Sequence, residues 1–320
     1  MKEFTITKND AGQRVDKFIL KSVPLLPKSL MYKYIRLKRI KLNGKRTDIA
    51  ARLSENDVLQ MYINDEFFEK SDENFSFLKA GKNLDIIYED ENIMLLDKKV
   101  GLLSHPDDTE YVDTLITRVQ RYLYEKGEYD PKNEAYFAPA LVNRIDRNTG
   151  GIVIAAKNAV SLRILNEKLK NREINKFYLC VLIGKPPKES DTVTAYAVKD
   201  EKKNKVAVFS SPVPGGKTMV TKYRVLKSEK GLSLAEVELL TGRTHQIRAH
   251  MAFIGCPLLG DGKYGTNEQN ARFGGYKKQF LYSYKTVFDF ETDAFELNYL
   301  KGKSFEVNDV WFSEDFPEKI

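Results

Sequence analysis

Residues 141–157 read LVNRIDRNTGGIVIAAK and place Asp146 between two arginines. Two apolar residues come before this polar segment, and the apolar run 152–156 follows a glycine pair. This pattern predicts a tight connection between two buried strands, and proteins often carry their chemistry on loops held in this way. An aspartate in a polar loop more often caps a turn or pairs with a neighbouring arginine. The residues alone therefore leave open both a catalytic and a structural role for Asp146.

The same stretch resembles the signature loop of the RluA-type pseudouridine synthases, in which His-Arg-Leu-Asp is followed by Thr-Ser-Gly and an apolar strand. The matching positions are Arg144, Asp146, Thr149 and Gly151, with Ile145 in place of leucine. Two positions depart from the motif, because Asn143 replaces histidine and Gly150 replaces serine. The resemblance implies that the protein isomerises uridine in RNA to pseudouridine with Asp146 as a catalytic residue. The two departures bear on the fit of the substrate more than on the chemistry.

Three further segments match motifs of this family. Lys176 and Tyr178 form its Lys-x-Tyr pattern, in which the tyrosine ring stacks on the target uracil, although the residues alone favour a core tyrosine. The longest match is LLTGRTHQIRAHMAFIGCPLLGDGKYG, residues 239–265, and the resemblance implies that its Arg248 pairs with Asp146. A guanidinium beside a carboxylate stabilises the ionised form and fixes its direction. The weakest match comprises Lys98, Gly101, His105 and Pro106.

The expected catalytic residues are therefore Asp146, Tyr178 and Arg248. Arg144 and Arg147 are expected to contact RNA, and Arg144 would fill the gap left when the target base leaves its stack. The residues expected to support the site are Asn143, Thr149, Arg243, His245 and Ile247. No second carboxylate lies near Asp146 in the sequence, which argues against an ordinary glycoside hydrolase. Attack of the carboxylate on the sugar, attack on the base, and a glycal route all stay open.

Composition is consistent with an RNA-binding enzyme. The chain has 320 residues, of which 42% are hydrophobic and 30% charged, enough for a sizeable core and two domains. Its formal net charge of +7 suits a polyanionic partner. Cys180 and Cys256 lie in apolar surroundings without CxxC spacing, as expected for reduced thiols. Because the sequence shows no signal peptide, bilayer-spanning run or glycine-rich phosphate loop, we expect a cytoplasmic monomer without cofactor or membrane contact.

Residues 1–64 are expected to form a small RNA-binding domain of α/β type, with two short helices, an Asn43-Gly44 hairpin turn and a strand at 58–63. From Lys17 to Thr47 there are ten lysines and arginines and no acidic residue, which indicates either a solvated surface or a nucleic-acid interface. The order of elements resembles the RNA-binding domain first named from ribosomal protein S-four. That resemblance implies phosphate contacts by Arg14, Lys33, Arg36, Lys38, Arg39 and Lys45.

Residues 65–83 are acidic and lack a clear period, which predicts a linker. Residues 84–320 are expected to form a catalytic domain of α+β class with a mixed, mainly antiparallel sheet. Within it, residues 184–216 predict extended surface connections, and the segments from 280–290 to VWF at 310–312 predict closing strands. The run KLKNREINK, residues 168–176, adds positive charge beside the expected cleft.

Two other functions are compatible with parts of the sequence. A non-catalytic RNA-binding protein with the same fold would be expected to lose one of the three catalytic residues, and all three are present. A metal-dependent RNA hydrolase could use His245 and His250, but five residues apart these lie on different faces of a helix or strand, so no metal is expected. The N-terminal module and the family resemblance favour large-subunit ribosomal RNA as the substrate. Transfer RNA stays the alternative, because both RNAs are recognised by shape and single-stranded bases.

Overall fold

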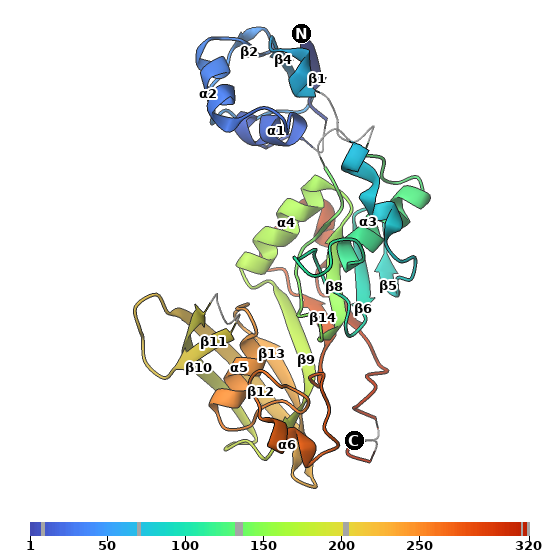
Figure 1. Ribbon diagram of the computed structural model, residues 1–320, viewed down its shortest axis with the longest axis vertical. Coiled ribbons are helices and arrows are strands. Elements are labelled where there is room, and N and C mark those ends of the chain that lie inside the picture. Colours follow the sequence, from blue (N-terminus) through green and yellow to red (C-terminus); the bar gives the residue numbers. More distant parts are fainter. Residues whose placement is uncertain (8–9, 69–71, 132–136, 201–204, 315, 319–320) are drawn as a thin grey trace.

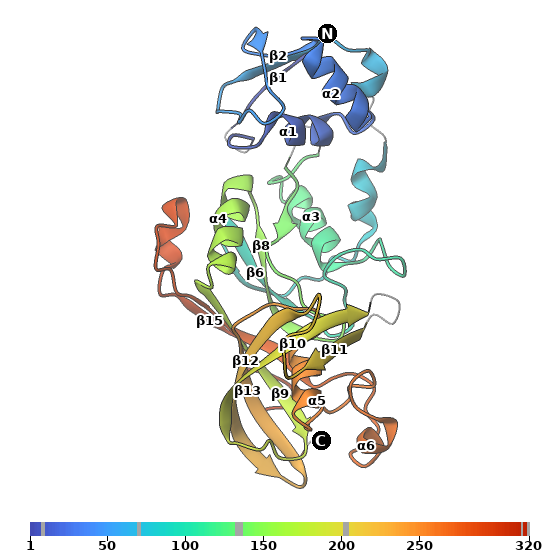
Figure 2. The same cartoon turned by 90° about the vertical axis from the view of Figure 1, so that its left-hand side faces the viewer.

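The computed structural model describes residues 1–320 except 8–9, 69–71, 132–136, 201–204, 315 and 319–320. Its strands form a four-stranded sheet near the N-terminus and an eleven-stranded sheet that takes up most of the remaining chain. Figures 1 and 2 show the smaller unit at one end of an elongated molecule. Among the described residues, no helix is long and apolar enough to cross a membrane.

The N-terminal unit, residues 1–63, has its own sheet and its own core. Its strands are β1 (Lys2–Thr5), β2 (Ile40–Leu42), β3 (Lys45–Arg46) and β4 (Val58–Met61), and its helices are α1 (Val15–Ser22) and α2 (Lys28–Arg36). The sheet order is β1-β4-β2-β3 with antiparallel neighbours, so the unit is not of α/β type in the strict sense. The predicted hairpin turn is confirmed, because Asn43 and Gly44 both have the positive φ that a type I′ turn requires.

The segment expected to be a linker is more ordered than its composition indicates. It contains the 3-10 helices η1 (Asp65–Phe68) and η2 (Asp72–Lys79). Phe67 and Phe68 pack against the core of the N-terminal unit, whereas Phe77 is 3% exposed and belongs to the core of the large sheet. Apolar contacts therefore attach the two ends of this segment to different units, a feature that its acidic composition hides.

The large sheet is mixed and mainly antiparallel, as predicted. Its order is β11-β10-β12-β13-β9-β14-β8-β6-β5, with β15 paired to β14 and β7 paired to β8. Within the described residues, β14 and β8 form its one parallel pair. The strands are β5 (Ile86–Glu89), β6 (Ile93–Lys98), β7 (Ala140–Leu141), β8 (Gly150–Ala156), β9 (Ile174–Ile183), β10 (Ser190–Asp200), β11 (Lys205–Phe209), β12 (Lys217–Glu229), β13 (Leu232–Leu239), β14 (Leu281–Phe288) and β15 (Ser304–Glu306).

Two expectations for this sheet were wrong. Residues 184–216 were expected to be surface connections, but they contain β10 and β11, which form one edge of the sheet. Edge strands often carry exposed lysines, so the lysine content of this segment did not exclude strands. Residues 310–312 form no strand; Val310 and Phe312 instead pack in an apolar cluster with Phe280. The closing strands of this region are β14, within residues 280–290 as predicted, and β15, which also lies before residue 310.

Helices cover both faces of the sheet around β8. On one face lies α3 (Leu115–Glu125), whose apolar residues share a core cluster with Val153 and Ala155, and α5 (Gln246–Phe253) belongs to the same cluster farther along the sheet, where it contacts β11 and β12. On the other lie α4 (Ala159–Lys170) and η3 (Phe295–Leu300), packed against the alternate residues Ile152 and Ile154. The short helix α6 (Asn267–Ala271) lies at the end of the molecule far from α4 (Figure 1). Because both faces are covered, every residue of β8 is buried, as its apolar sequence predicts.

The glycine pair at the start of β8 permits a close approach to β14. Gly151 has φ of 107°, and a Cβ there would lie 2.1 Å from the carbonyl oxygen of Ser283. A Cβ on Gly150 would lie 2.5 Å from Cε2 of Tyr282. The loop carrying Asp146 therefore enters the sheet at a point where only glycine fits.

Candidate active site

A cavity of about 800 Å³ lies at the loop that carries Asp146. Its walls come from residues 103–107, residues 142–147, the C-terminal part of α4, strand β9 and residues 239–245. Asp146 and Tyr178 both line it, although they lie on different elements. Its volume is within the range of small-molecule sites and exceeds what one base needs.

A hydrogen bond within the turn and two groups from another segment hold the Asp146 loop in place. The backbone N–H of Thr149 donates to the carbonyl oxygen of Asp146 at 3.0 Å, which closes the turn. The buried Ser104 hydroxyl donates to Ile145 O at 2.9 Å and accepts from Ile145 N at 3.3 Å. The fully buried Lys98 ammonium donates to the carbonyl oxygens of Lys99, Leu102 and Arg147.

Burial affects the acid–base equilibrium of the Lys98 ammonium. It lowers the pKa of Lys98 to about 7, although the charges of Asp146 and Asp97 act in the opposite direction. Thr149 is also buried, and its hydroxyl accepts a bond from Gln279 at 3.3 Å. The loop is therefore fixed on both sides of Asp146 by buried polar groups, an arrangement that keeps the carboxylate direction constant.

Arg248 on α5 joins Asp146 to a second, buried carboxylate. Its Nη1 donates to Asp146 Oδ2 at 2.9 Å, which is the pairing that the resemblance implied. Its Nε and Nη2 donate to the two oxygens of Asp261 at 2.7 and 2.9 Å. Burial alone would lower the pKa of Arg248, but its bonds to Asp261 and Asp146 raise the pKa above the usual value. The guanidinium is therefore charged and held in one plane.

Asp261 is far from Asp146 in the sequence but is linked to it in space through Arg248. It is 1% exposed, and although burial raises its pKa, hydrogen bonds from Arg248 and from backbone N–H groups lower the pKa overall. Both of its oxygens are occupied by Arg248, and it does not line the large cavity. It is placed to orient Arg248, not to act as the second acid of a glycoside hydrolase.

Tyr178 lies on β9 with its ring in the wall of the cavity and is 5% exposed. Burial, together with the nearby charge of Asp146, raises the pKa of Tyr178 to about 12, so its hydroxyl is neutral at physiological pH. Lys176 lies two residues away on the same face of β9 and also lines the cavity. Burial lowers the pKa of the Lys176 ammonium. The Lys-x-Tyr pattern thus supplies an aromatic ring and a cation to one wall.

The two histidines considered for a metal site point to different partners. His245 has the left-handed backbone conformation, with φ of 52°, at the start of α5. Its Nδ1 lies 3.0 Å from the Tyr264 hydroxyl and its Nε2 lies 4.0 Å from Asp146 Oδ2. His250 is fully buried, and its Nδ1 lies 2.8 Å from Thr221 Oγ1. Within the part of the chain that is described, no three potential ligands form a metal-binding group.

The other residues expected at the site divide between the cavity and the scaffold. Arg144 is exposed on the cavity wall, and Arg147, also in the wall, donates to Gly101 O at 3.1 Å. Arg243 lines the cavity and donates to Thr218 O at 3.1 Å. Ile247 is 4% exposed and is a core residue. The expected positive charge of residues 168–176 is present in the wall as Lys170 and Lys176.

Both departures from the signature loop have structural explanations. The Asn143 side-chain oxygen accepts the Ile154 backbone N–H at 2.8 Å, so this residue satisfies a donor of β8 while lining the cavity. Gly150 is buried beside Tyr282 and does not line the cavity. The glycine therefore reflects packing against β14 and not a change in the substrate site.

In the N-terminal unit, most of the residues expected to contact phosphates are free to do so. Lys33, Arg36, Lys38, Arg39 and Lys45 are exposed. Arg14 differs, because its guanidinium makes two hydrogen bonds to Asp16, at 3.0 and 2.9 Å. Asp16 lies directly before the acid-free run from Lys17 to Thr47. The pattern of that run therefore did not indicate the pairing of Arg14 with Asp16.

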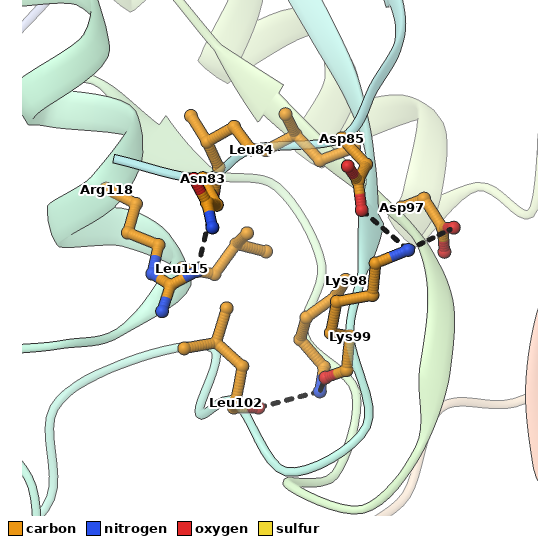
Figure 3. A pocket seen from close by; sticks show the side chains of 10 residues that line it. Asn83, Leu84, Asp85, Asp97, Lys98, Lys99, Leu102, Leu115 and Arg118 are labelled. Carbon is orange, nitrogen blue, oxygen red and sulfur yellow. Dashed lines mark hydrogen bonds and ion pairs between the residues drawn. The ribbon is translucent and has the colours of Figure 1, made fainter. Parts of the chain in front are cut away.

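A second cavity, of about 330 Å³, is lined in part by Lys98 and Lys99 (Figure 3). Its charged groups already have partners. Lys99 lies 2.6 Å from Asp85 and 3.6 Å from Asp97, and Arg118 donates to Asn83 O at 2.9 Å. None of the expected site residues lines it. The larger cavity is therefore the better candidate for an active site.

The structure adds three groups that sequence reasoning did not assign to the site. Asp261 lies in the Gly-Asp-Gly turn that ends the longest motif match, and an acid between two glycines was the available signal. Lys98 belongs to the weakest motif match, but no role was given to it. Ser104 carried no signal, because a serine in a polar loop is common and its buried partner is 41 residues away.

Comparisons with known proteins find a matching family model and relatives over most of the chain. A family model described as RNA pseudouridylate synthase matches residues 92–253. An uncharacterised RNA pseudouridine synthase of Mycoplasma genitalium is 33% identical over 299 residues, covering 92% of both chains. The ribosomal large subunit pseudouridine synthase D of Borreliella burgdorferi is 31% identical over 297 residues, covering 92% of this chain and 87% of that one.

A solved structure shows the same fold. Human RNA pseudouridylate synthase domain containing 1 superposes with a TM-score of 0.53 at 21% identity, covering 66% of this chain and 81% of that chain. At this identity the likeness concerns the fold of the large unit and not the details of the site.

Proposed function

Because the chain belongs to the RNA pseudouridylate synthase family, and is thus an isomerase that acts on RNA, we propose that it uses Asp146 to convert uridines of large-subunit ribosomal RNA to pseudouridine. The observation that carries the assignment of Asp146 is its geometry. Its side chain is 27% exposed and lines the cavity, while Oδ2 is held by a buried guanidinium. Its Oδ1 accepts no hydrogen bond from any described residue and is free to act.

The chemistry requires one carboxylate and a closed site. The bond between uracil N1 and the anomeric carbon breaks, a bond from that carbon to C5 forms, and the C5 proton is lost as N1 gains one. In the proposal, Asp146 promotes cleavage of the glycosidic bond and Tyr178 holds the free uracil by stacking while it turns. Water must be excluded, because hydrolysis would otherwise compete.

Arg248 and Arg144 have distinct proposed roles. Arg248, fixed by Asp261, keeps the carboxylate ionised and pointed into the cavity. Arg144 is exposed at the mouth of the cavity and would occupy the space in the RNA that the extruded uridine leaves. Extrusion of a base costs roughly a few kcal/mol, which such a contact helps to offset.

The choice of ribosomal RNA rests on the relatives. The protein of Borreliella burgdorferi is named for the ribosomal large subunit, and the likeness to it spans 92% of this chain. We also propose that exposed cations of the N-terminal unit contact phosphates outside the cavity, which requires an RNA larger than the target site. These residues are Lys33, Arg36, Lys38, Arg39 and Lys45. Mapping pseudouridine with carbodiimide across cellular RNA, with and without this gene, tests the choice, and loss of sites in transfer RNA alone would refute it.

The role of Asp146 is tested by Asp146→Asn. Asparagine keeps the shape and an acceptor for Arg248 but removes the charge, so we expect no isomerisation and nearly unchanged RNA affinity. The measurement is release of tritium from RNA labelled at uridine C5. A matched control is Asp107→Asn. Asp107 lines the same cavity, but its carboxylate accepts hydrogen bonds from the Thr109 hydroxyl and the Glu110 backbone N–H. Release by Asp146→Asn at the wild-type rate would exclude Asp146 as the catalytic residue.

A further inference from the structure

Two arginines from different units meet at Gly12. The Arg52 guanidinium donates to Gly12 O at 2.7 Å, and a Cβ on Gly12 would lie 3.9 Å from Cζ of Arg163. Both arginines are exposed, and within the described ranges neither forms an ion pair with an acidic side chain. Two like charges near each other that form no ion pair favour the binding of an anion.

Helix α4 connects this arginine pair to the cavity. Arg163 lies on the helix, and Asn166 and Lys170 follow it at three and seven residues, on one side of the helix. Asn166 and Lys170 line the cavity. The rise of an α-helix places Lys170 about 10 Å along the axis from Arg163. Figures 1 and 2 both show α4 between α1 of the N-terminal unit and the start of β9.

One acidic residue, Glu167, lies near this side of the helix. It is exposed and, at 100° per residue, is turned by about 40° from Arg163 and about 60° from Lys170. It does not line the cavity, whereas Asn166, Leu169 and Lys170 do. Of the charged residues 163, 167 and 170 of α4, the one in the cavity wall is therefore a cation, Lys170.

We propose that Arg52, Arg163, Asn166 and Lys170 form a binding track for the RNA backbone, which leads the strand from the catalytic cavity along α4 to the N-terminal unit. The inference rests on the proposed function, since it assumes that RNA occupies the cavity. Guanidinium and ammonium groups bind phosphates without reading the base, so the track positions RNA without selecting sequence. An RNA too short to pass along α4 would use the cavity but not the arginine pair.

The experiment measures the salt dependence of binding to two probes, polyuridylate and the dinucleotide uridylyl-uridine. The variants are Arg52→Ala and Arg163→Ala, with Arg163→Lys to restore the charge. The matched control is Arg272→Ala, because Arg272 is an exposed arginine at the end of α6, far from α4 (Figure 1). The three side chains are all on the surface, and thermal melts of the four variants verify folding.

For polyuridylate, we expect Arg52→Ala and Arg163→Ala each to lower the log-log salt slope by about 0.7, the value for one phosphate contact on a single strand. Arg163→Lys should restore the slope, and Arg272→Ala should leave it unchanged. For the dinucleotide, no variant should change the affinity. If the wild-type enzyme releases tritium but the slopes of the wild type and both alanine variants are equal, the binding track is refuted and the proposed function is not. Absence of pseudouridine in RNA treated with wild type would instead overturn the proposed function.

Discussion

Replacing Arg248 tests whether one guanidinium holds the reactive carboxylate. Arg248 makes one hydrogen bond to Asp146 and two to Asp261, all between 2.7 and 2.9 Å. A hydrogen bond to a charged group contributes about 1.5–3 kcal/mol, which corresponds to a roughly 10- to 150-fold change in rate when the bond acts in the transition state. We therefore expect Arg248→Ala to lose at least this factor in the isomerisation step.

The same substitution also affects stability. Asp261 is buried, and removing one partner of a buried ion pair costs about 3–5 kcal/mol, because it leaves the other charge without compensation. Arg248→Lys keeps the charge but lacks the planar fork that bonds both carboxylates, so we expect it to restore only part of the rate. Arg243→Ala is the control. The Arg243 side chain lines the same cavity and, among the described residues, donates a hydrogen bond only to Thr218 O, so its loss should cost about 1 kcal/mol and less than tenfold in rate.

The assay is single-turnover release of tritium from RNA labelled at uridine C5, with enzyme in excess. Urea denaturation gives the free energy of unfolding for each variant, so that rates are compared at equal folded fraction. The expected order is wild type, Arg243→Ala, Arg248→Lys and Arg248→Ala, from fastest to slowest. If Arg243→Ala is slower than Arg248→Ala among folded molecules, the carboxylate depends on a different arginine.

Deleting residues 1–64 should weaken RNA binding and reduce the dependence of its affinity on salt, while a minimal RNA is still converted. Filter binding at several salt concentrations measures the slope, and an unchanged slope would show that the basic surface is only solvated. Burial lowers the pKa of His250 from 6.5 to about 4, so the unfolded chain takes up a proton first as pH falls. The free energy of unfolding should therefore decrease between pH 6.5 and pH 4, by about 3 kcal/mol at most, and urea titrations of His250→Asn should lack this decrease. Gly150→Ser should destabilise the fold by about 1–3 kcal/mol, because the new Cβ would contact the Tyr282 ring. In a double-mutant cycle, Gly150→Ser should cost less in the Tyr282→Ala variant than in the wild type.

Local patterns determined much of what the sequence alone could predict. The Asn43-Gly44 turn and the buried strand β8 were both expected, because each depends on dihedral preference or apolar spacing within a few residues. The motif residues Asp146, Tyr178 and Arg248 were also found from the sequence, since each lies in a recognisable short segment. Local patterns failed for β10 and β11, where lysine and proline content concealed an edge of the sheet.

The tertiary structure alone decided how these segments meet. Arg248 lies 102 residues after Asp146, and Asp261 another 13 residues on, yet the packing of α5 against the sheet joins them in one chain of hydrogen bonds. Ser104 and Lys98 hold the Asp146 loop for the same reason, because the end of β6 and the turn before β8 lie side by side. The meeting of Arg52 and Arg163 depends on how two separately folded units are placed. Such contacts follow from which faces bury apolar surface against each other over the whole chain, and no short stretch of sequence contains that information.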